Sequence, residues 1–281
     1  MSDDKYPEES GRRRFVKGVV GGAALAGVGV TGSVTINSAT TSPGAGGGAT
    51  QAFAIENTGG PAPRGMPQIP LEIDSEGYLK GVWPEEQTVT AGGRQIQVAE
   101  TQDFKGTGVT YSGAWFQYCG VESYPGIQPG FESDNYFRAG PSPGYDWQSE
   151  AKSEGDRFHV DDFSNYKTWG NGIGRAGVGK PATGVWRSED VDDVIPIQII
   201  RSEQIEEAAQ DDPWLQASTS EGFIAWLNKC THFCCVPGYK QQSGSAKFGA
   251  ENSVYCACHQ SVYDPFSIVQ TLFTARPRPT E

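Results

Sequence analysis

The sequence predicts a mainly β protein with a membrane-anchoring helix at its N-terminus. Glycine (37) and proline (18) are abundant among the 281 residues, which is typical of short strands joined by many turns. The apolar runs of the C-terminal two thirds are short and separated by turn sequences, as in antiparallel sheets. One uncharged apolar run near the N-terminus is long enough to cross a bilayer.

The N-terminus carries a sequence typical of a twin-arginine export signal. Residues 12–17 read Arg-Arg-Arg-Phe-Val-Lys, two arginines and a spacer followed by a large apolar residue and a lysine. The following run, Val19 to Ile36, would span about 27 Å as a helix, close to the hydrocarbon thickness of about 30 Å. Because cleavage signals close behind it are poor, we expect a retained single-pass anchor over 19–37 in the cell membrane. Residues 1–18 would then be cytoplasmic, and the rest of the chain would lie outside the cytoplasm.

The middle of the chain predicts a tether and a β-rich segment. Residues 38–70 are rich in Gly, Ala, Thr and Pro, and we expect them to form a flexible tether. Residues 71–155 contain strand-like runs such as 94–100 and 108–118 and have no predicted role. Their aromatic side chains favour a second small β core over a ligand site, with a docking surface as the functional alternative.

Residues 156–281 show the clearest strand pattern. The expected strands are "RFHVDDF" (157–163), "TGVWRS" (183–188), "VIPIQIIRS" (194–202) and "GFIAWLNK" (222–229). The run 202–210 predicts a short helix, because Ser202 can cap it and Glu203 places a negative charge in its first turn. Two cysteine-rich loops, 229–239 and 255–266, follow strand ends and can therefore face each other.

Charge and residue counts limit the classes of function. The formal net charge is −12, which disfavours a nucleic-acid-binding face. The acidity fits a high-salt source such as a halophilic archaeon, and it equally fits an ordinary acidic surface. Five of the six cysteines lie between Cys230 and Cys258, and only three histidines exist. This concentration of cysteines predicts one site and not a general disulfide scaffold.

The two cysteine-rich loops predict a metal site. Each offers one cysteine and one histidine, as Cys230-x-His232 and Cys256-x-x-His259. A structural zinc with Cys₂His₂ ligands is one possibility, although zinc sites usually use Cys-x₂₋₄-Cys and His-x₃₋₅-His pairs. One Cys and one His per loop fits a two-iron cluster that has two cysteines on one iron and two histidines on the other.

At these loops the chain resembles the Rieske iron–sulfur proteins. Their two boxes read Cys-Thr-His-x-Gly-Cys and Cys-Pro-Cys-His-Gly-Ser, and this chain has "CTHFCC" (230–235) and "CACHQS" (256–261). Eight of the twelve positions match. The resemblance covers about 156–281 and is weak outside the boxes. It implies an antiparallel Rieske-type β domain with an inserted cluster-binding subdomain.

The resemblance also implies the ligands of a Rieske [2Fe–2S] cluster. Cys230 and Cys256 would bind the inner iron, and His232 and His259 would bind the outer iron. A ligand histidine with its second nitrogen exposed could take up a proton together with the electron. His232 and His259 are therefore the candidate catalytic residues, and His259 is the expected contact of quinol.

Further cluster-binding roles follow from the same resemblance. Ser261 matches the serine whose hydroxyl binds a bridging sulfide, and Tyr263 matches the tyrosine whose hydroxyl binds a cysteine ligand. Both would raise the reduction potential. Cys235 and Cys258 match the family's disulfide, which joins the two loops.

Three positions depart from the family pattern, and two cysteines remain unassigned. Ala257 replaces a proline, and Cys234 and Gln260 replace glycines, which puts the loop geometry in doubt because glycine provides backbone freedom. Cys119 and Cys234 remain after the ligands and the family disulfide are subtracted. They could form a second disulfide or two free packed thiols, or Cys234 could pair with Cys258 in place of Cys235.

Within the family, the anchor and tether favour the Rieske subunit of a cytochrome bc-type quinol-oxidising complex. Such a subunit accepts an electron from quinol, works beside a cytochrome b-type subunit in a dimeric complex, and reduces a cytochrome c or a small copper protein. The alternative is the small subunit of an exported molybdenum oxidase such as arsenite oxidase. An oxygenase needs two more histidines for a second iron, and only His159 remains. A soluble Rieske ferredoxin does not fit the export signal.

Overall fold

The computed structural model describes residues 49–274, apart from 92, 120, 122–126 and 192–194. This part of the chain is mainly β, and its named strands pair in antiparallel fashion, so the predicted fold class is confirmed at this level. The arginine motif, the expected anchor at 19–37 and the C-terminal tail lie outside the described residues. Among the residues described, no helix is long and apolar enough to cross a membrane.

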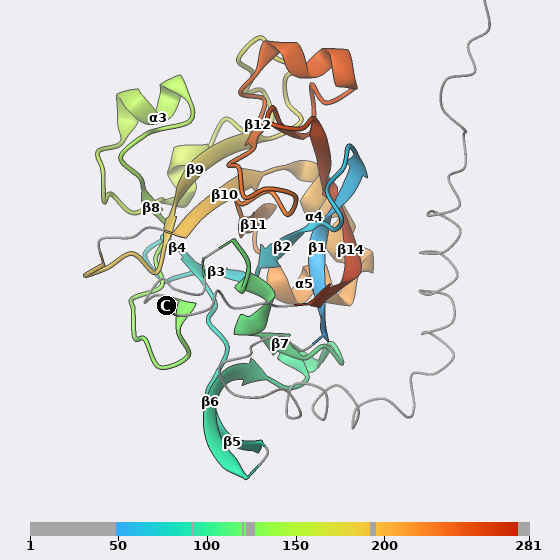
Figure 1. Cartoon of the computed structure of the whole chain (residues 1–281). Coiled ribbons are helices and arrows are strands. Elements are labelled where there is room, and N and C mark those ends of the chain that lie inside the picture. The colour runs from blue at the N-terminus through green and yellow to red at the C-terminus, as the bar shows by residue number, and fades with distance from the viewer. Residues whose placement is uncertain (1–48, 92, 120, 122–126, 192–194, 275–281) are drawn as a thin grey trace, which may run out of the picture.

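A large sheet organises the molecule (Figure 1). In the described part its strand order is β12-β13-β14-β1-β2-β11-β10-β9-β8. The strands are β1 (Ala49–Gly59), β2 (Met66–Ile69), β8 (Arg138–Ala139), β9 (Lys180–Trp186), β10 (Ile195–Arg201), β11 (Phe223–Leu227), β12 (Gly238–Tyr239), β13 (Val254–Cys256) and β14 (Ser261–Thr274).

The N-terminal strands occupy the middle of this sheet. β1 pairs with β14 along most of its length, for example Ile55 with Ile268 and Asn57 with Tyr263. β2 pairs with β1 on one side and with β11 on the other. The prediction of a flexible tether over 38–70 is therefore wrong from residue 49 onward. Apolar residues such as Ile55 and Ile69 are completely buried, so this segment contributes to the core and cannot be free.

The strands predicted at 183–188, 194–202 and 222–229 form the adjacent meander of β9, β10 and β11. The predicted helix is α4 (Glu203–Asp211), and the Ser202 hydroxyl caps it by accepting a hydrogen bond from the backbone N–H of Gln204. A second helix, α5 (Pro213–Ser218), follows directly. Asp212 caps α5 through the N–H of Leu215, and Pro213 occupies its first turn, where a missing N–H has no cost.

Smaller elements complete the described structure. They are the pair β3 (Leu71–Ile73) and β4 (Leu79–Gly81), the sheet of β5 (Glu86–Ala91), β6 (Arg94–Thr101) and β7 (Tyr111–Ser112), helix α3 (Asp146–Ala151) and 3₁₀ helices at Phe104–Gly106, Gly113–Phe116, Val160–Phe163 and Ser243–Phe248. The β5–β6 hairpin projects from the rest of the molecule (Figure 1).

Two strand predictions are corrected here. The run 157–163 ends in the 3₁₀ helix Val160–Phe163, because His159 and Asp162 form a capping box at its start. Within 108–118 only Tyr111–Ser112 (β7) is a strand. Ser112 accepts a hydrogen bond from the N–H of Ala114 and so starts the 3₁₀ helix Gly113–Phe116.

Most of the described aromatic residues of 71–155 belong to the main core. Trp115 packs edge-on to Tyr111 and lies 5.5 Å, centroid to centroid, from Trp214 of α5. Phe116 packs against Trp186 of β9 at 5.6 Å. The expectation of a second small β core is therefore wrong: one cluster of buried residues joins this segment to β9, β10 and β11.

Candidate metal centre

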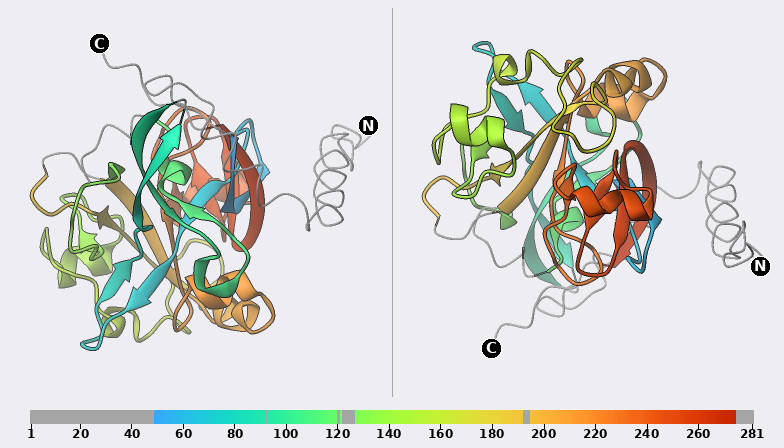
Figure 2. Two further views of the ribbon diagram at one scale, coloured as in Figure 1. Left: turned by 90° about the horizontal axis from the view of Figure 1, so that it is seen from below. Right: turned by 90° about the horizontal axis from the view of Figure 1, so that it is seen from above.

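Two loops at one end of the large sheet carry the predicted ligands. The first joins β11 to β12, and the second is the turn between β13 and β14. Both belong to the orange-to-red part of the chain, which gathers on one side of the molecule in the right view of Figure 2. The rings of His232 and His259 have centroids 4.8 Å apart, so the loops meet as the sequence analysis expected.

The first loop is a compact turn that closes on itself. The backbone N–H of Cys230 donates to the carbonyl of Cys235 at 2.7 Å, and the N–H of Cys234 donates to the carbonyl of Cys230 at 3.0 Å. At its base the buried Asn228 amide donates to the carbonyl of Pro237 at 3.0 Å. These bonds fix the backbone of the turn.

The second loop is a tight hairpin turn. Cys256 pairs with Ser261 across the hairpin, and the N–H of Gln260 donates to the carbonyl of Cys256 at 2.8 Å. Gln260 has φ 61°, and Cys234 in the first loop has φ 64°. Both residues therefore keep the left-handed conformation that glycine adopts most easily, although neither is glycine. The two loops therefore carry a conformational cost at Cys234 and Gln260 that glycine would not have.

Two buried thiols form the inner part of the site. Cys230 and Cys256 are free cysteines with 0% and 1% exposure. Hydrogen bonding with the Cys256 thiol and with the Tyr263 hydroxyl, which lies 3.1 Å from the Cys230 sulfur, lowers the pKa of Cys230. The pKa of Cys256 is raised because its thiol donates to Cys230 and is buried. The pair therefore holds one thiolate readily, the form of cysteine that binds metals.

The two imidazoles form the outer part of the site. His259 is exposed and His232 is half-buried. The Nδ1 atom of His232 is buried and has no hydrogen-bond partner among the described residues. Phe233 packs on both rings, with centroid distances of 4.3 Å and 5.0 Å, and is itself 66% exposed, as Val236 is 60%. The first loop thus presents two exposed apolar side chains, Phe233 and Val236, which we call the apolar rim.

Unpaired polar atoms point to a group that the protein atoms alone do not supply. The Ser261 hydroxyl is buried without a partner in the described part of the chain, as is Nδ1 of His232. A buried polar group without a partner is costly, and a bound ligand, an ion or a water would satisfy these atoms. Two buried sulfurs, two imidazoles and a free hydroxyl fit a group that takes sulfur and nitrogen ligands and accepts hydrogen bonds. A Rieske [2Fe–2S] cluster has these properties.

Four cysteines form two disulfides. Cys235 bonds to Cys258 and joins the two loops, and Cys119 bonds to Cys234 with a Cα–Cα distance of 5.3 Å. The alternatives of free thiols or of a Cys234–Cys258 bond are not what the structure contains. The sulfurs of Cys235, Cys256 and Cys258 lie within 4.8 Å of one another. Since two of these sulfurs share a disulfide, this group cannot supply three thiolates to a metal.

Several residues that contact the site were not identified from the sequence. The Thr231 hydroxyl donates to the backbone carbonyl of Arg64 at 2.5 Å, and the Tyr118 hydroxyl donates to the carbonyl of Lys229 at 2.8 Å. Gly60 lies directly against the second loop. These contacts come from residues distant in sequence. The only sequence signal was the unassigned Cys119, next to Tyr118.

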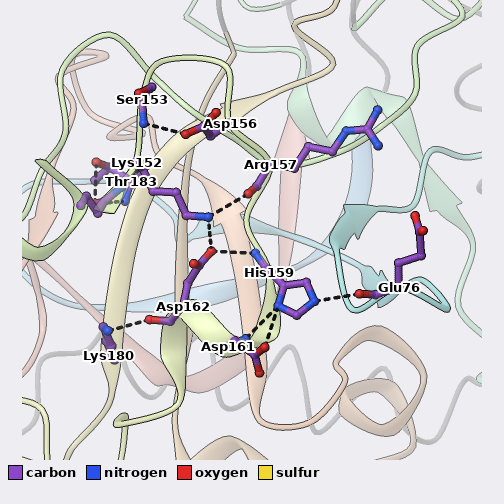
Figure 3. Close-up of polar contacts among 11 residues, drawn as sticks. Glu76, Lys152, Ser153, Asp156, Arg157, His159, Asp161, Asp162, Lys180 and Thr183 are labelled. Atoms are coloured by element: carbon purple, nitrogen blue, oxygen red, sulfur yellow. Dashed lines mark hydrogen bonds and ion pairs between the residues drawn. The ribbon is translucent and has the colours of Figure 1, made fainter. Parts of the chain in front are cut away.

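The third histidine lies apart from this site. His159 has a 26% exposed side chain, and its Nε2 lies 2.7 Å from the carbonyl of Glu76, while its Nδ1 accepts from the N–H of Asp161 (Figure 3). Both ring nitrogens are therefore used in fixing the 74–78 turn to the 3₁₀ helix at 160. Asp162 binds Lys152 at 2.6 Å in the same network. His159 therefore has a structural role here.

Comparisons with protein-family models, with curated proteins and with solved structures found no match.

Proposed function

We propose that this chain is a Rieske-type electron-transfer subunit of a cytochrome bc-type quinol-oxidising complex. The observation that supports it most directly is the arrangement of the four expected ligands. Two buried thiols lie side by side, and two imidazoles lie together nearer the surface, with a buried hydroxyl and a ring nitrogen left without partners.

In this proposal Cys230 and Cys256 hold the inner iron and His232 and His259 hold the outer iron of a [2Fe–2S] cluster. When bound, the cluster supplies reversible one-electron chemistry at a potential raised by its neutral imidazole ligands. Tyr263 keeps its hydroxyl on the Cys230 sulfur, and Ser261 offers its hydroxyl inside the site. Both donors favour the more negative, reduced state and so raise the potential further.

The exposed histidine accounts for proton uptake. His259 is the more accessible of the two, so a quinol hydroxyl can donate a hydrogen bond and then a proton to its free ring nitrogen. The apolar rim of Phe233 and Val236 suits contact with an apolar quinol or with a cytochrome b-type subunit. The electron acceptor in the proposal is a cytochrome c or a small copper protein.

The proposed location is the outer face of the cell membrane, with the N-terminal anchor holding the chain in the bilayer. Disulfides are typical of such an oxidising compartment, and this chain has two. Because β1 begins at Ala49, any tether between anchor and head is confined to residues 38–48, which lie outside the described part.

Electron paramagnetic resonance of membranes at poised potentials, combined with metal analysis, tests the proposal. We expect a reduced Rieske-type signal under a mild reductant such as ascorbate, and a shift of that signal when a quinol-site inhibitor is added. A Rieske signal that no quinol-site inhibitor shifts would favour the molybdenum-oxidase subunit instead. Zinc without iron would refute the cluster and support a structural Cys₂His₂ site.

A further inference from the structure

The first ligand loop is held from outside by a segment that lies more than a hundred residues earlier in the chain. Tyr118 and Cys119 contact it at three points, and we call these two residues the brace. The Tyr118 hydroxyl donates to the carbonyl of Lys229 at 2.8 Å. The Cys119 sulfur lies 3.8 Å from the carbonyl of Cys230 and forms the disulfide with Cys234.

These three points enclose the metal-binding part of the loop. Lys229 and Cys230 begin the turn, and Cys234 lies near its end. Cys230 is one expected ligand, and His232 lies between the held positions. Tyr118 is 4% exposed and follows directly on the 3₁₀ helix Gly113–Phe116, whose Trp115 and Phe116 are completely buried. The brace is therefore anchored in the main core and can transmit its rigidity to the loop.

The disulfide also explains how the loop accommodates a cysteine where glycine would fit. Cys234 has φ 64° and Cys119 has φ 59°, and side chains with a Cβ are disfavoured in this left-handed region. Such conformations persist where the surrounding structure enforces them. A covalent bond to a segment fixed in the core is such a constraint.

We propose that Tyr118 and the Cys119–Cys234 disulfide are positioning elements that hold Cys230 and His232 in ligand geometry. The inference rests on the proposed cluster for its functional meaning, while the hold on the loop is a property of the chain itself. Neighbours that orient metal ligands typically change metal affinity or activity by about 10–100-fold when they are removed. Loss of the brace is therefore expected to speed cluster loss about tenfold.

The test compares four variants of the full chain. Tyr118→Phe removes one hydroxyl, and C119S/C234S removes the disulfide while keeping a Cβ at the left-handed position. C119S/C234G removes the same disulfide but restores glycine. Tyr111→Phe is the control, because it removes another buried hydroxyl bound to a backbone carbonyl, that of Val82 at 2.7 Å, and that carbonyl does not belong to either ligand loop.

Two measurements separate this inference from the proposed function. The first is the alkylation rate of Cys230 and Cys256 in the iron-free chain, which needs no cluster. The second is the rate of cluster bleaching under a chelator, with the linewidth of the reduced resonance signal. We expect Tyr118→Phe and C119S/C234S to raise the alkylation rate of Cys230 and to broaden the signal, and C119S/C234G to be less affected than C119S/C234S.

Each outcome decides one of the two claims. Unchanged alkylation in both Tyr118→Phe and C119S/C234S, or an equal increase in Tyr111→Phe, would overturn the brace. A wild-type chain without a cluster would refute the proposed function, and the alkylation rates would still decide whether the brace holds the loop. Equal effects of the serine and glycine variants would refute the claim that the disulfide maintains the left-handed turn.

Discussion

The substitution Gly60→Ala tests how closely the N-terminal part of the chain supports the second ligand loop. Gly60 follows β1 and has φ +80°. A Cβ added there would lie 2.5 Å from the carbonyl oxygen of Gln260 and 2.6 Å from the Cα of Ser261. Both atoms belong to the backbone of the second loop, so the clash cannot be relieved by rotating a side chain.

The magnitude has two parts. A non-glycine residue in the left-handed conformation costs about 1–2 kcal/mol, and forcing extra atoms into packed structure costs about 1–3 kcal/mol more. Gly60→Ala is therefore expected to lower the free energy of unfolding by about 2–5 kcal/mol. Gly155 provides the matched control, since it has φ +84° and, within the described structure, open space around the added Cβ. Gly155→Ala should cost only the first part, about 1–2 kcal/mol.

Guanidinium denaturation of the two variants and the wild type, followed by tryptophan fluorescence, measures the difference. The iron content of the same preparations reports the effect on the site, because a displaced second loop moves Cys256 and His259. We expect a loss of bound iron in Gly60→Ala and none in Gly155→Ala. If both variants lose equal stability, the close contact between Gly60 and the loop does not exist as described.

Three further predictions concern single side chains. Tyr263→Phe removes the hydroxyl on the Cys230 sulfur, and a hydrogen bond of about 1–1.4 kcal/mol corresponds to about 40–60 mV for one electron. Redox titration should therefore show a midpoint potential lower by that amount. An unchanged midpoint potential would contradict the proposed role of Tyr263 in raising the potential. Ser261→Ala should stabilise the iron-free chain by about 1 kcal/mol, because it removes a buried hydroxyl without a partner. The same substitution should lower the midpoint potential of the iron-loaded protein. If the iron-free chain loses stability instead, the Ser261 hydroxyl is not unpartnered as described. Burial and, secondarily, the charge of Arg175 lower the pKa of Lys240 to about 8, so the folded chain loses this proton more easily than the unfolded chain. Between pH 7 and 9 the free energy of unfolding should therefore rise by about 1 kcal/mol more in the wild type than in Lys240→Met. If it changes equally with pH in the two proteins, Lys240 is not the cause.

The sequence predicted β9, β10, β11 and the two ligand loops well because their signals are local. Alternating and continuous apolar runs gave β9, β10 and β11, and Ser202 marked the start of α4. The ligand pairs were visible because Cys-x-His and Cys-x-x-His are short spacings. The left-handed conformation at Cys234 and Gln260 could not be predicted in the same way, because it depends on hydrogen bonds and a disulfide that close each turn.

The errors in the N-terminal half have a common physical cause. Residues 49–69 were predicted to be part of a tether because glycine, proline and alanine dominate their surroundings. Pairing with β14 and β11 overrides this local preference for a flexible chain. The sequence offers no signal for such pairing, since the partners lie some 200 residues apart. The aromatic residues of 71–155 were recognised as core-forming, yet which core they join depends on the same long-range contacts.

The arrangement of these contacts changes which part of the chain builds the site. The expected ligands all lie after residue 229, but three supports come from before residue 120: Gly60 beneath the second loop, the Arg64 carbonyl that binds Thr231, and the brace. Between them, β1 and β2 separate β14, which follows the second loop, from β11, which leads into the first. The strands β1 and β2, which lie far from both loops in the sequence, thus set the relative position of the two loops and of the two histidines. The strands β1 and β2 and the brace accordingly belong to the scaffold of the proposed metal centre, because they set the separation of the loops and hold the left-handed turn at Cys234.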